Sequence, residues 1–491
     1  MLLAIDQGTS ATKAVLVDAA GRVVARGSAS VAQSHPQPGW VEQSATEIWD
    51  SVRAAVADCL AGQDAASVAG VGLSAQRESL VLWARSSGEP VGPLLSWQDQ
   101  RTAAHCGRLR AEGAGERVRS LSGLPVDPMF SAPKATWLLD AHDPDRSRSR
   151  RGGLCLGTVD SWLLSRLGGD HLIEVGNASR TQLLDVRTCQ WSPELLDLFG
   201  VPPEVLPNVV ASAGPFPPVS GLPPLRDGTP VLAVMGDSHA ALFAHAGWRP
   251  GQVKATYGTG SSIMSLGHLP ESGSDALCAT VAWDDGAPRH AVEGNIRASG
   301  ATLTWLAAVL GLTPEALAEQ AAGSSDGVHL VPAFGGLGAP WWDDEAVGLF
   351  SGLTFGTRAP QLARAALESI AFQVEDVVAA VHREVAPVQT LLADGGPTAN
   401  RTLMQLQADT SDRRVRVPRD RDLSALGAAH LAGVGAGIWD RSALEALDRG
   451  GEIYLPQEAE PSRRQRLALW HGAVARARAR GTGEDRGRTP A

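Results

Sequence analysis

Cysteine is scarce in this sequence, and the positions of its cysteines exclude two kinds of site. Five cysteines are spread over 491 residues, and none forms a Cys-X-X-Cys pair or a cluster with histidine. Zinc sites and small disulfide-bonded domains both need closely spaced or paired cysteines. We therefore expect neither a zinc site nor a disulfide framework, and we expect a reducing compartment.

Long apolar segments are also missing. The N-terminus, MLLAIDQGTS, has no basic residue and reaches an acidic residue at Asp6, unlike a secretory signal peptide. No apolar stretch approaches the roughly 18 residues that a membrane-spanning helix requires. We expect a soluble, cytoplasmic protein that has no membrane partner.

An excess of positive charge is absent as well. The chain has 43 Lys and Arg residues against 53 Asp and Glu residues, a formal net charge of -10. This balance argues against a nucleic-acid or anionic-membrane partner, although it leaves room for a local phosphate site. The length predicts at least two domains, and a hydrophobic content of 44% is typical of globular proteins.

The first 83 residues predict strands that alternate with a helix. Residues 1–30 form apolar runs interrupted at Gly8 and Gly21, which predicts a hairpin and a meander. Residues 45–61 have helical spacing, with Ile48, Val52, Val56 and Leu60 on one face and a cap near Ser44 or Thr46. Residues 67–83 predict a strand, a polar turn and another strand.

A proline-rich segment, residues 214–230, separates two halves that begin alike. Each half opens with an apolar strand that ends in an aspartate beside glycine, Asp6 and Asp237, and each contains a Gly-Thr turn. We therefore predict an α/β protein with two related domains, residues 1–230 and 231–475, that face one cleft. The charged, glycine-containing tail, residues 476–491, is predicted to be disordered.

Glycine turns with phosphate-binding chemistry occur at three places. DQGTSATK places Asp6 at a strand end before glycine, hydroxyl groups and Lys13, and its carboxylate suits Mg²⁺. TYGTGS, residues 256–261, has the same chemistry, and ADGGPTANRT puts two glycines between a strand and a helix. Each turn alone is also compatible with an ordinary hairpin. Three together predict a nucleotide site.

These motifs and their order resemble the FGGY family of carbohydrate kinases, and within it they are most similar to glycerol kinases. The matching segments are AIDQGTS, QPGWVEQSATEIW, SAQRESLVLW, SWQDQRT, SGLPVDPMFSAPKATWLLD, GTVDSWLL, NASRTQLLD, GDSHAALF, TYGTGS, FGGLGAPWWD, LESIAFQ and DGGPTANRTLMQLQADTSDRRVRVP. They extend from about residue 3 to residue 440. The resemblance implies two actin-like (ribonuclease-H-like) ATPase domains that close on ATP, Mg²⁺ and a small polyol or sugar.

The resemblance assigns a role to each matching residue of the acceptor side. Asp237 is the catalytic base, Arg77 and Glu78 bind the hydroxyl groups of the substrate, and Trp97 supports its carbon chain. A carboxylate suits this reaction because the hydroxyl loses its proton late in phosphoryl transfer. Local structure offers plainer alternatives: a helix cap for Asp237, an exposed ion pair for Arg77 and Glu78, and ordinary core packing for Trp97.

The nucleotide side is assigned in the same way. Asp6 is the carboxylate nearest Mg²⁺. The residues that match the phosphate and nucleotide contacts of the family are Thr9, Ser10, Lys13, Gly258, Thr259, Gly395, Gly396 and Asn400. The expected cofactors are therefore ATP and Mg²⁺, and a homodimer is compatible with the family pattern.

Three positions depart from glycerol kinases. Met129, Ser238 and Ser262 stand where those enzymes carry tyrosine, glutamine and phenylalanine at the substrate. The loss of one hydrogen bond to a substrate costs about 1–3 kcal/mol, and the smaller side chains open space. The acceptor is therefore glycerol or a longer polyol or ketose. A xylulokinase-like specificity is the main rival, although such enzymes carry Met-His where this chain has Arg77-Glu78.

Two other classes of function share parts of this pattern. An actin-like or heat-shock-protein-like ATPase that acts as a binding module would share the phosphate turns, but it would not need Asp237, Arg77, Glu78 and Trp97. A hydrolase built on Ser238 and His239 would need a nucleophile elbow of the GXSXG type, which is absent. Adjacent residues of a strand also point to opposite faces. Both alternatives are disfavoured.

Overall fold

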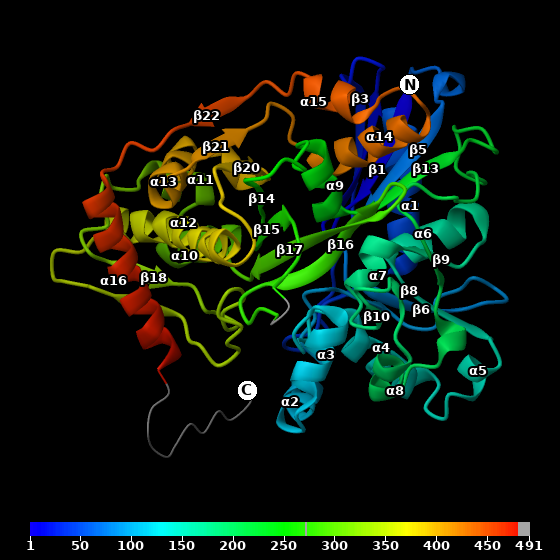
Figure 1. Ribbon diagram of the computed structural model, residues 1–491, viewed down its shortest axis with the longest axis horizontal. Helices are drawn as coiled ribbons and strands as arrows, with labels where there is room; N and C mark the ends of the chain where they lie inside the picture. Colours follow the sequence, from blue (N-terminus) through cyan, green and yellow to red (C-terminus); the bar gives the residue numbers. More distant parts are fainter. Residues whose placement is uncertain (271–272, 480–491) are drawn as a thin grey trace.

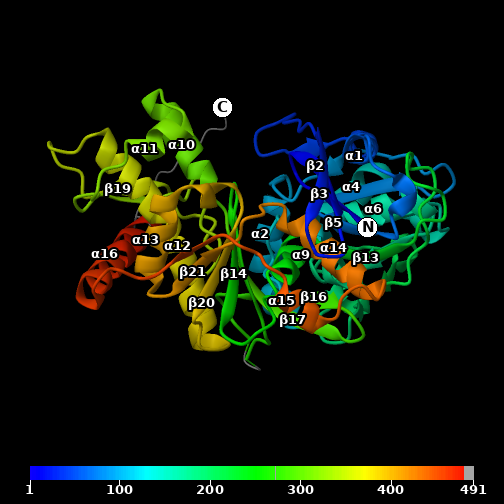
Figure 2. The same cartoon turned by 90° about the horizontal axis from the view of Figure 1, so that it is seen from above.

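The computed structural model describes residues 1–270 and 273–479. Two α/β domains lie side by side (Figures 1 and 2). The sheet of the first runs in the order β13-β5-β1-β2-β3. Its strands are β1 (Leu2–Gln7), β2 (Ala11–Val17), β3 (Val23–Ser30), β5 (Gly70–Ala75) and β13 (Val231–Gly236). β1, β2 and β3 form the predicted antiparallel meander. β5 runs parallel to β1, and β13 runs parallel to β5.

Helices cover both faces of this sheet, and the alternation of side chains along β1 explains why. Leu3 and Ile5 point towards α1 (Ala45–Cys59), and Leu2 and Ala4 point towards α14 (Leu423–Gly435). A strand that is buried on both faces reads as a continuous apolar run. The prediction of α1 is confirmed, because Ile48, Val52 and Val56 are buried. The side chain of Ser44 caps the helix by accepting from the backbone N–H of Glu47 at 3.2 Å.

The second sheet repeats the same strand pattern. It runs in the order β16-β17-β15-β14-β20-β21-β22. Its strands are β14 (Gln252–Tyr257), β15 (Ser261–Leu266), β16 (Cys278–Asp284), β17 (Pro288–Ile296), β20 (Thr390–Asp394), β21 (Arg414–Val417) and β22 (Glu452–Tyr454). β14, β15 and β17 are antiparallel, and β20 and β21 continue parallel to β14. The two domains are therefore related in topology, as predicted.

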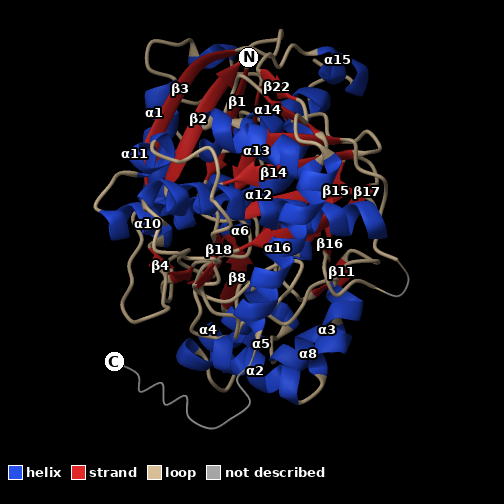
Figure 3. Cartoon of the chain, turned by 90° about the vertical axis from the view of Figure 1, so that its left-hand side faces the viewer, coloured by secondary structure: helices blue, strands red, loops and turns tan. Residues whose placement is uncertain are grey.

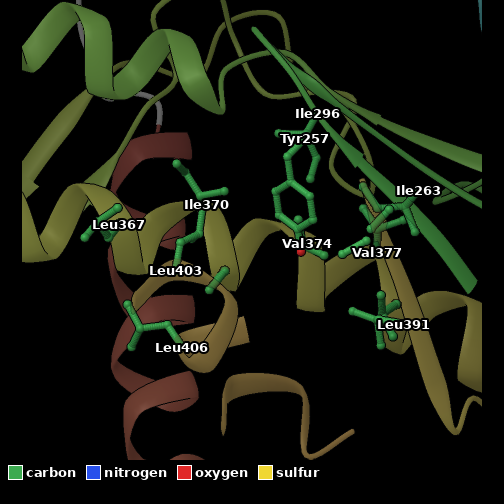
Figure 4. Close-up of a cluster of buried hydrophobic side chains, with 14 of the residues drawn as sticks. Tyr257, Ile263, Ile296, Leu367, Ile370, Val374, Val377, Leu391, Leu403 and Leu406 are labelled. Atoms are coloured by element: carbon green, nitrogen blue, oxygen red, sulfur yellow. The ribbon is translucent and has the colours of Figure 1, made fainter. Parts of the chain in front are cut away.

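The core of the second domain lies between this sheet and its helices. The long helix α12 (Ala359–Glu384) packs with α10 (Gly300–Leu310) and α13 (Arg401–Ser411). Figure 4 shows Ile370, Val374 and Val377 of α12 beside Leu391 of β20 and Leu403 of α13. Figure 3 views this helical side, with α12, α13 and α16 (Glu460–Arg478) in front of the sheet.

A smaller sheet extends the first domain, in the order β4-β7-β6-β8. The predicted strand, turn and strand of residues 67–83 are confirmed, but β5 lies in the main sheet and β6 in the smaller one. The strands here are β4 (Glu42–Gln43), β6 (Leu80–Ala84), β7 (Leu94–Leu95) and β8 (Leu154–Thr158). The helices of this region are α2 (Ala103–Ala111), α3 (Ala114–Ser122), α4 (Ser131–His142), α5 (Ser147–Arg150), α6 (Val159–Gly168), α7 (Val175–Ser179) and α8 (Pro193–Phe199).

The remaining elements are short. They are β9 (Leu172–Glu174), β10 (Leu184–Asp185), β11 (Gln190–Trp191), β12 (Asn208–Val210), α9 (Asp237–Ala244), α11 (Pro314–Glu319), β18 (His329–Val331), β19 (Leu349–Ser351) and α15 (Arg441–Ala446). None of the described helices is long and apolar enough to cross a membrane.

The first sheet extends past the boundary that we expected at residue 230. β13 begins at Val231 and pairs with β5, so it belongs to the first domain. The helix α14, which follows β21 of the second domain, also packs on the first sheet and lies among its strands in Figure 2. Apolar residues such as Ala233 and Ala428 are buried there. The proline-rich segment therefore does not separate the two sheets.

The expected tail begins within a helix. α16 continues to Arg478, because Ala473, Val474 and Ala477 are buried against Trp341 and its neighbours. Residues 480–491 lie outside the described residues.

Candidate active site

A cavity of about 380 Å³ lies between the two domains and brings together most of the predicted site residues. The predicted residues that line it are Thr9, Ser10, Arg77, Glu78, Trp97, Met129, Asp237, Ser238, Gly258, Thr259 and Ser262. Gln33, Gln98, Asn295 and Arg297 also line it and were not predicted. A larger cavity of about 720 Å³, beside Trp305 and Phe334, contains none of the predicted residues. The site chemistry therefore belongs to the smaller cavity.

Asp237 begins helix α9 directly after β13. Asp237, Ser238 and His239 occupy the first turn of this helix. The expectation that Ser238 and His239 lie on a strand is therefore wrong. A helix N-terminus favours a carboxylate, and the Asp237 carboxylate accepts from the backbone N–H of Ser238 at 2.6 Å. Arg77 Nε lies 3.3 Å from Asp237 Oδ1. Desolvation in the cleft raises the pKa of Asp237, and the Arg77 guanidinium opposes that shift.

Asp6 lies on β1 of the same sheet. Burial, followed by the charge of Asp237, raises the pKa of Asp6 to about 7, although Ser74 donates a hydrogen bond to it at 2.9 Å. A carboxylate whose pKa is raised by a second carboxylate lies where a cation is favoured. Among the described residues, no group of three or more Asp, Glu, His or Cys side chains could hold a metal ion. Asp6 does not line the cavity, and a single carboxylate of this kind would suit an Mg²⁺ ion held mainly by nucleotide phosphates.

The first phosphate turn connects β1 with β2. The backbone N–H of Gly8 donates to the carbonyl of Ala11 at 3.0 Å, which leaves Thr9 and Ser10 at the cavity. Trp97 Nε1 donates to Thr9 Oγ1 at 3.0 Å. Lys13 lies outside this cavity, and its Nζ pairs with Asp422 at 3.0 Å. The turn thus contributes hydroxyl groups directly, whereas the ammonium group of Lys13 is engaged elsewhere.

The second and third turns are neighbours. β14 and β20 are parallel and pair Thr256 with Asp394, so the turns that follow them meet at one edge of the sheet. Gly395 has φ +96°, and a Cβ there would overlap the carbonyl oxygen of Tyr257. Only glycine allows this approach.

The residues of the third turn stay outside the cavity. Asn400 caps α13 by accepting from the backbone N–H of Leu403 at 3.0 Å. Gly395, Gly396 and Asn400 lie next to the second turn and do not line the cavity. Their assignment to the nucleotide remains a prediction.

Arg77 and Glu78 are both buried, which contradicts the alternative of an exposed ion pair. They follow β5 at the turn towards β6, and Glu78 has φ +62°. They do not pair with each other. Arg77 donates to Glu293 at 2.8 and 2.7 Å, and Glu78 accepts from Arg180 Nε at 2.6 Å. The site therefore holds the pair through two further charged residues.

Glu293 and Arg180 were not predicted from the sequence. Glu293 lies in HAVEGNI of β17, where a single acidic residue interrupts a buried strand, and that interruption was the available signal. It also accepts from Ser262 Oγ at 2.7 Å and from Asn295 at 3.0 Å. Ser262 therefore joins a hydrogen-bond network in addition to leaving space where glycerol kinases carry phenylalanine.

Three charged residues hold the loop that carries Met129. Lys134 is buried and donates to the carbonyls of Pro128 and Met129, each at 2.6 Å. Asp127 accepts from the backbone N–H of Met129 at 2.8 Å, and from Arg297 of the second domain at 2.6 Å. Burial lowers the pKa of Lys134 to about 8. The Met129 side of the cavity is therefore tied to both domains.

The hydrolase alternative gains no support. In the described structure, no hydrogen bond joins Ser238 to His239. His239 is fully buried, with Nε2 3.4 Å from Arg77 and 3.3 Å from Thr280 Oγ1. Burial, followed by the charge of Arg77, lowers the pKa of His239 well below its usual range. The imidazole of His239 therefore contacts Arg77 and Thr280 and not Ser238.

Comparisons with known proteins agree with this geometry. The N-terminal domain of the FGGY family of carbohydrate kinases matches residues 1–244, and the C-terminal domain of that family matches residues 253–436. The glycerol kinase of Aromatoleum aromaticum is 44% identical, over 97% of this chain and 98% of its own. The apulose kinase of Pectobacterium atrosepticum is 41% identical, over 98% of this chain and 99% of its own.

The fold is similar to a solved member of the same group. The structure of Plasmodium falciparum glycerol kinase with ADP has a TM-score of 0.88 at 27% identity, and covers 98% of each chain. The predicted two-domain fold is confirmed, and kinases in this group are ATP-dependent phosphotransferases. The chain belongs to the FGGY family of carbohydrate kinases.

Proposed function

We propose that the protein transfers the γ-phosphate of ATP to a primary hydroxyl group of a small polyol, with glycerol as the first candidate. The observation that carries this proposal is the cavity itself. Asp237 and Arg77 line it together with the hydroxyl and glycine turns that contain Thr9 and Gly258. Full-length similarity to glycerol kinases supports the same conclusion. The proposal includes a cytoplasmic location, where ATP is available, and a homodimer that sedimentation analysis would test.

The residues of the chain divide the work of phosphoryl transfer. Asp237 accepts the proton of the attacking hydroxyl, and Arg77 and Glu78 orient the acceptor by donating and accepting hydrogen bonds. The turns at Thr9 and Gly258 donate N–H and O–H groups to phosphate oxygens. Asp6 would hold Mg²⁺ together with the phosphates, and the ion would supply charge neutralisation.

A four- or five-carbon ketose or polyol is the second candidate acceptor. The observation in its favour is the size of the side chains at the acceptor wall, where Met129, Ser238 and Ser262 line the cavity. Each is smaller than, or chemically different from, the residue expected in a glycerol kinase. The apulose kinase relative also acts on a sugar.

The test is an assay of acceptor-dependent ADP formation. Glycerol, erythritol, threitol, erythrulose, xylulose and ribulose are compared as acceptors, and turnover with at least one of them is expected. D237N should lower kcat by about 10²–10⁴-fold while ATP binding is retained. The matched control is D160N, which changes a buried aspartate in the first turn of α6, outside the cavity. Absence of turnover with every acceptor, or full activity of D237N, would refute the proposal.

A further inference from the structure

A buried cluster of charged side chains lies directly behind Arg77 and Glu78. Its centre is Glu293, with Arg180 beside it at 2.9 Å between Arg180 NH1 and Glu293 Oε2. Both side chains are fully buried, and neither lines the cavity. They therefore have no access to an acceptor or to a nucleotide, and any effect they have on the reaction passes through other residues.

Glu293 determines how Arg77 is oriented. The two terminal nitrogens of Arg77 donate to the two carboxylate oxygens of Glu293, at 2.8 and 2.7 Å. A paired arrangement of this kind fixes the plane of the guanidinium. The remaining nitrogen, Nε, then faces Asp237 at 3.3 Å. The same carboxylate thus sets the distance between the substrate-binding arginine and the expected base.

Arg180 extends this constraint to Glu78. Its Nε donates to Glu78 Oε1 at 2.6 Å, and its NH2 donates to Asn295 Oδ1 at 3.2 Å. Its third nitrogen is the one paired with Glu293. One buried carboxylate therefore holds Arg77 directly and Glu78 through Arg180.

The charges of the cluster depend on one another. Burial alone would raise the pKa of Glu293, but the guanidiniums of Arg180 and Arg77 lower it well below its usual range. The carboxylate is therefore ionised. Removal of one member of a buried ion pair leaves its partner uncompensated, so a neutral residue at position 293 should release Arg77 and Arg180 from their present geometry.

The cluster also joins the two domains. Arg77 and Glu78 follow β5, and Arg180 follows α7, all in the first domain, whereas Glu293 lies on β17 of the second. We propose that Glu293, acting with Arg180, is the positioning residue that fixes Arg77 and Glu78 for the acceptor and makes their geometry depend on how the domains are placed. This inference rests on the proposed function, in which Arg77 and Glu78 bind the acceptor.

The test compares E293Q and R180M with a matched pair elsewhere. E293Q keeps the shape of the side chain and removes its charge. We expect the acceptor KM to rise by at least about tenfold and kcat to fall, with the KM for ATP within about twofold of the wild-type value. Because both residues act on the same pair, the double variant should lose much less activity than the product of the two single losses.

The control pair is Glu375 and Arg413, a partly buried ion pair at 2.8 Å in the second domain that does not line the cavity. E375Q makes the same carboxylate-to-amide change away from the cavity and should leave the acceptor KM unchanged. If E293Q only lowers the melting temperature, as E375Q does, and leaves the acceptor KM unchanged, the positioning role is wrong. R180M answers the question should E293Q fail to fold.

Failure of this inference is distinguishable from failure of the proposed function. The wild-type enzyme is assayed first with the acceptor panel. A wild-type enzyme without turnover refutes the proposed function, whereas an active wild-type enzyme with unaltered E293Q and R180M kinetics refutes the positioning role alone.

Discussion

The indole Nε1 of Trp97 donates a hydrogen bond to the hydroxyl oxygen of Thr9 at 3.0 Å. Trp97 belongs to the wall on which the acceptor is expected to rest, and Thr9 belongs to the first phosphate turn. Both line the same cavity. The backbone carbonyl of Thr9 also accepts from Gln43 at 2.9 Å. A hydrogen bond therefore joins the acceptor wall directly to the phosphate turn.

W97F should weaken the binding of ATP. The change keeps an aromatic ring for the acceptor and removes the donor to Thr9, so the KM for ATP should rise about fivefold, the equivalent of one hydrogen bond. T9V removes the other partner and serves as the comparison. Steady-state kinetics of the two single variants and the double variant measure the coupling. Additive effects of the two changes would show that the bond is unimportant.

D127N should raise the acceptor KM about five- to tenfold. The asparagine carbonyl can still accept from the backbone N–H of Met129, but its amide would face the donating nitrogen of Arg297, so the bridge between the domains is lost. Arg297 also donates to Asp344 at 2.6 Å, outside the Met129 loop. D344N is therefore the control, and an equal effect of the two variants would contradict a special role for Asp127.

S262F should shift specificity towards glycerol. A phenylalanine at this position fills space in the cavity and removes the hydrogen bond to Glu293. A change of this size in the volume of a substrate pocket alters the ratio of kcat/KM for two substrates by roughly 10–200-fold. We expect kcat/KM for four- and five-carbon acceptors to fall at least tenfold relative to that for glycerol. S262A, which removes the hydroxyl group without adding bulk, controls for the lost hydrogen bond.

D6N should be more stable than the wild-type enzyme at neutral pH, and inactive. The folded-state pKa of Asp6 is about 7, above the ordinary value of 3.8. The folded protein therefore binds more protons than the unfolded chain between these values, and wild-type stability falls as the pH rises from about 4 to about 7. D6N has no group that titrates at this position. Its free energy of unfolding should therefore exceed that of the wild-type enzyme by roughly 1–4 kcal/mol at pH 8.

Denaturant unfolding of both proteins at pH 5 and pH 8 measures this difference. The gap should widen between the two pH values, because Asp6 is still mostly protonated at pH 5. The loss of activity in D6N follows from the loss of the carboxylate that is expected to hold Mg²⁺. A wild-type enzyme whose stability relative to D6N is independent of pH would contradict the raised pKa.

Much of the site could be predicted from short segments. Asp237 and the glycine turns lie at strand ends, where apolar periodicity stops and polar residues begin, and their chemistry is visible locally. The face of α1 and its cap at Ser44 are similarly local. The boundary expected at residue 230 was drawn from proline content, which indicates a loop but not the sheet to which the next strand belongs. β13 pairs with β5 and therefore belongs to the first sheet.

The partners of the charged residues could not be predicted in this way. Arg77 and Glu293 are 216 residues apart, and Arg180 and Glu78 are 102 apart. Lys13 carries the charge expected of a phosphate ligand, yet its partner in the structure is Asp422. An ion pair becomes specific only when burial removes water from both groups, and burial is a property of the assembled domains.

The sequence by itself determined the strand and helix pattern and the glycine turns, because each depends on neighbouring residues, and its resemblance to the FGGY family singled out Asp237. Only the tertiary structure decided that Glu293 holds Arg77 and Arg180, and that Arg297 reaches Asp127. The physical reason is that these pairs form across two domains, where chain folding, and not sequence distance, brings opposite charges together out of water.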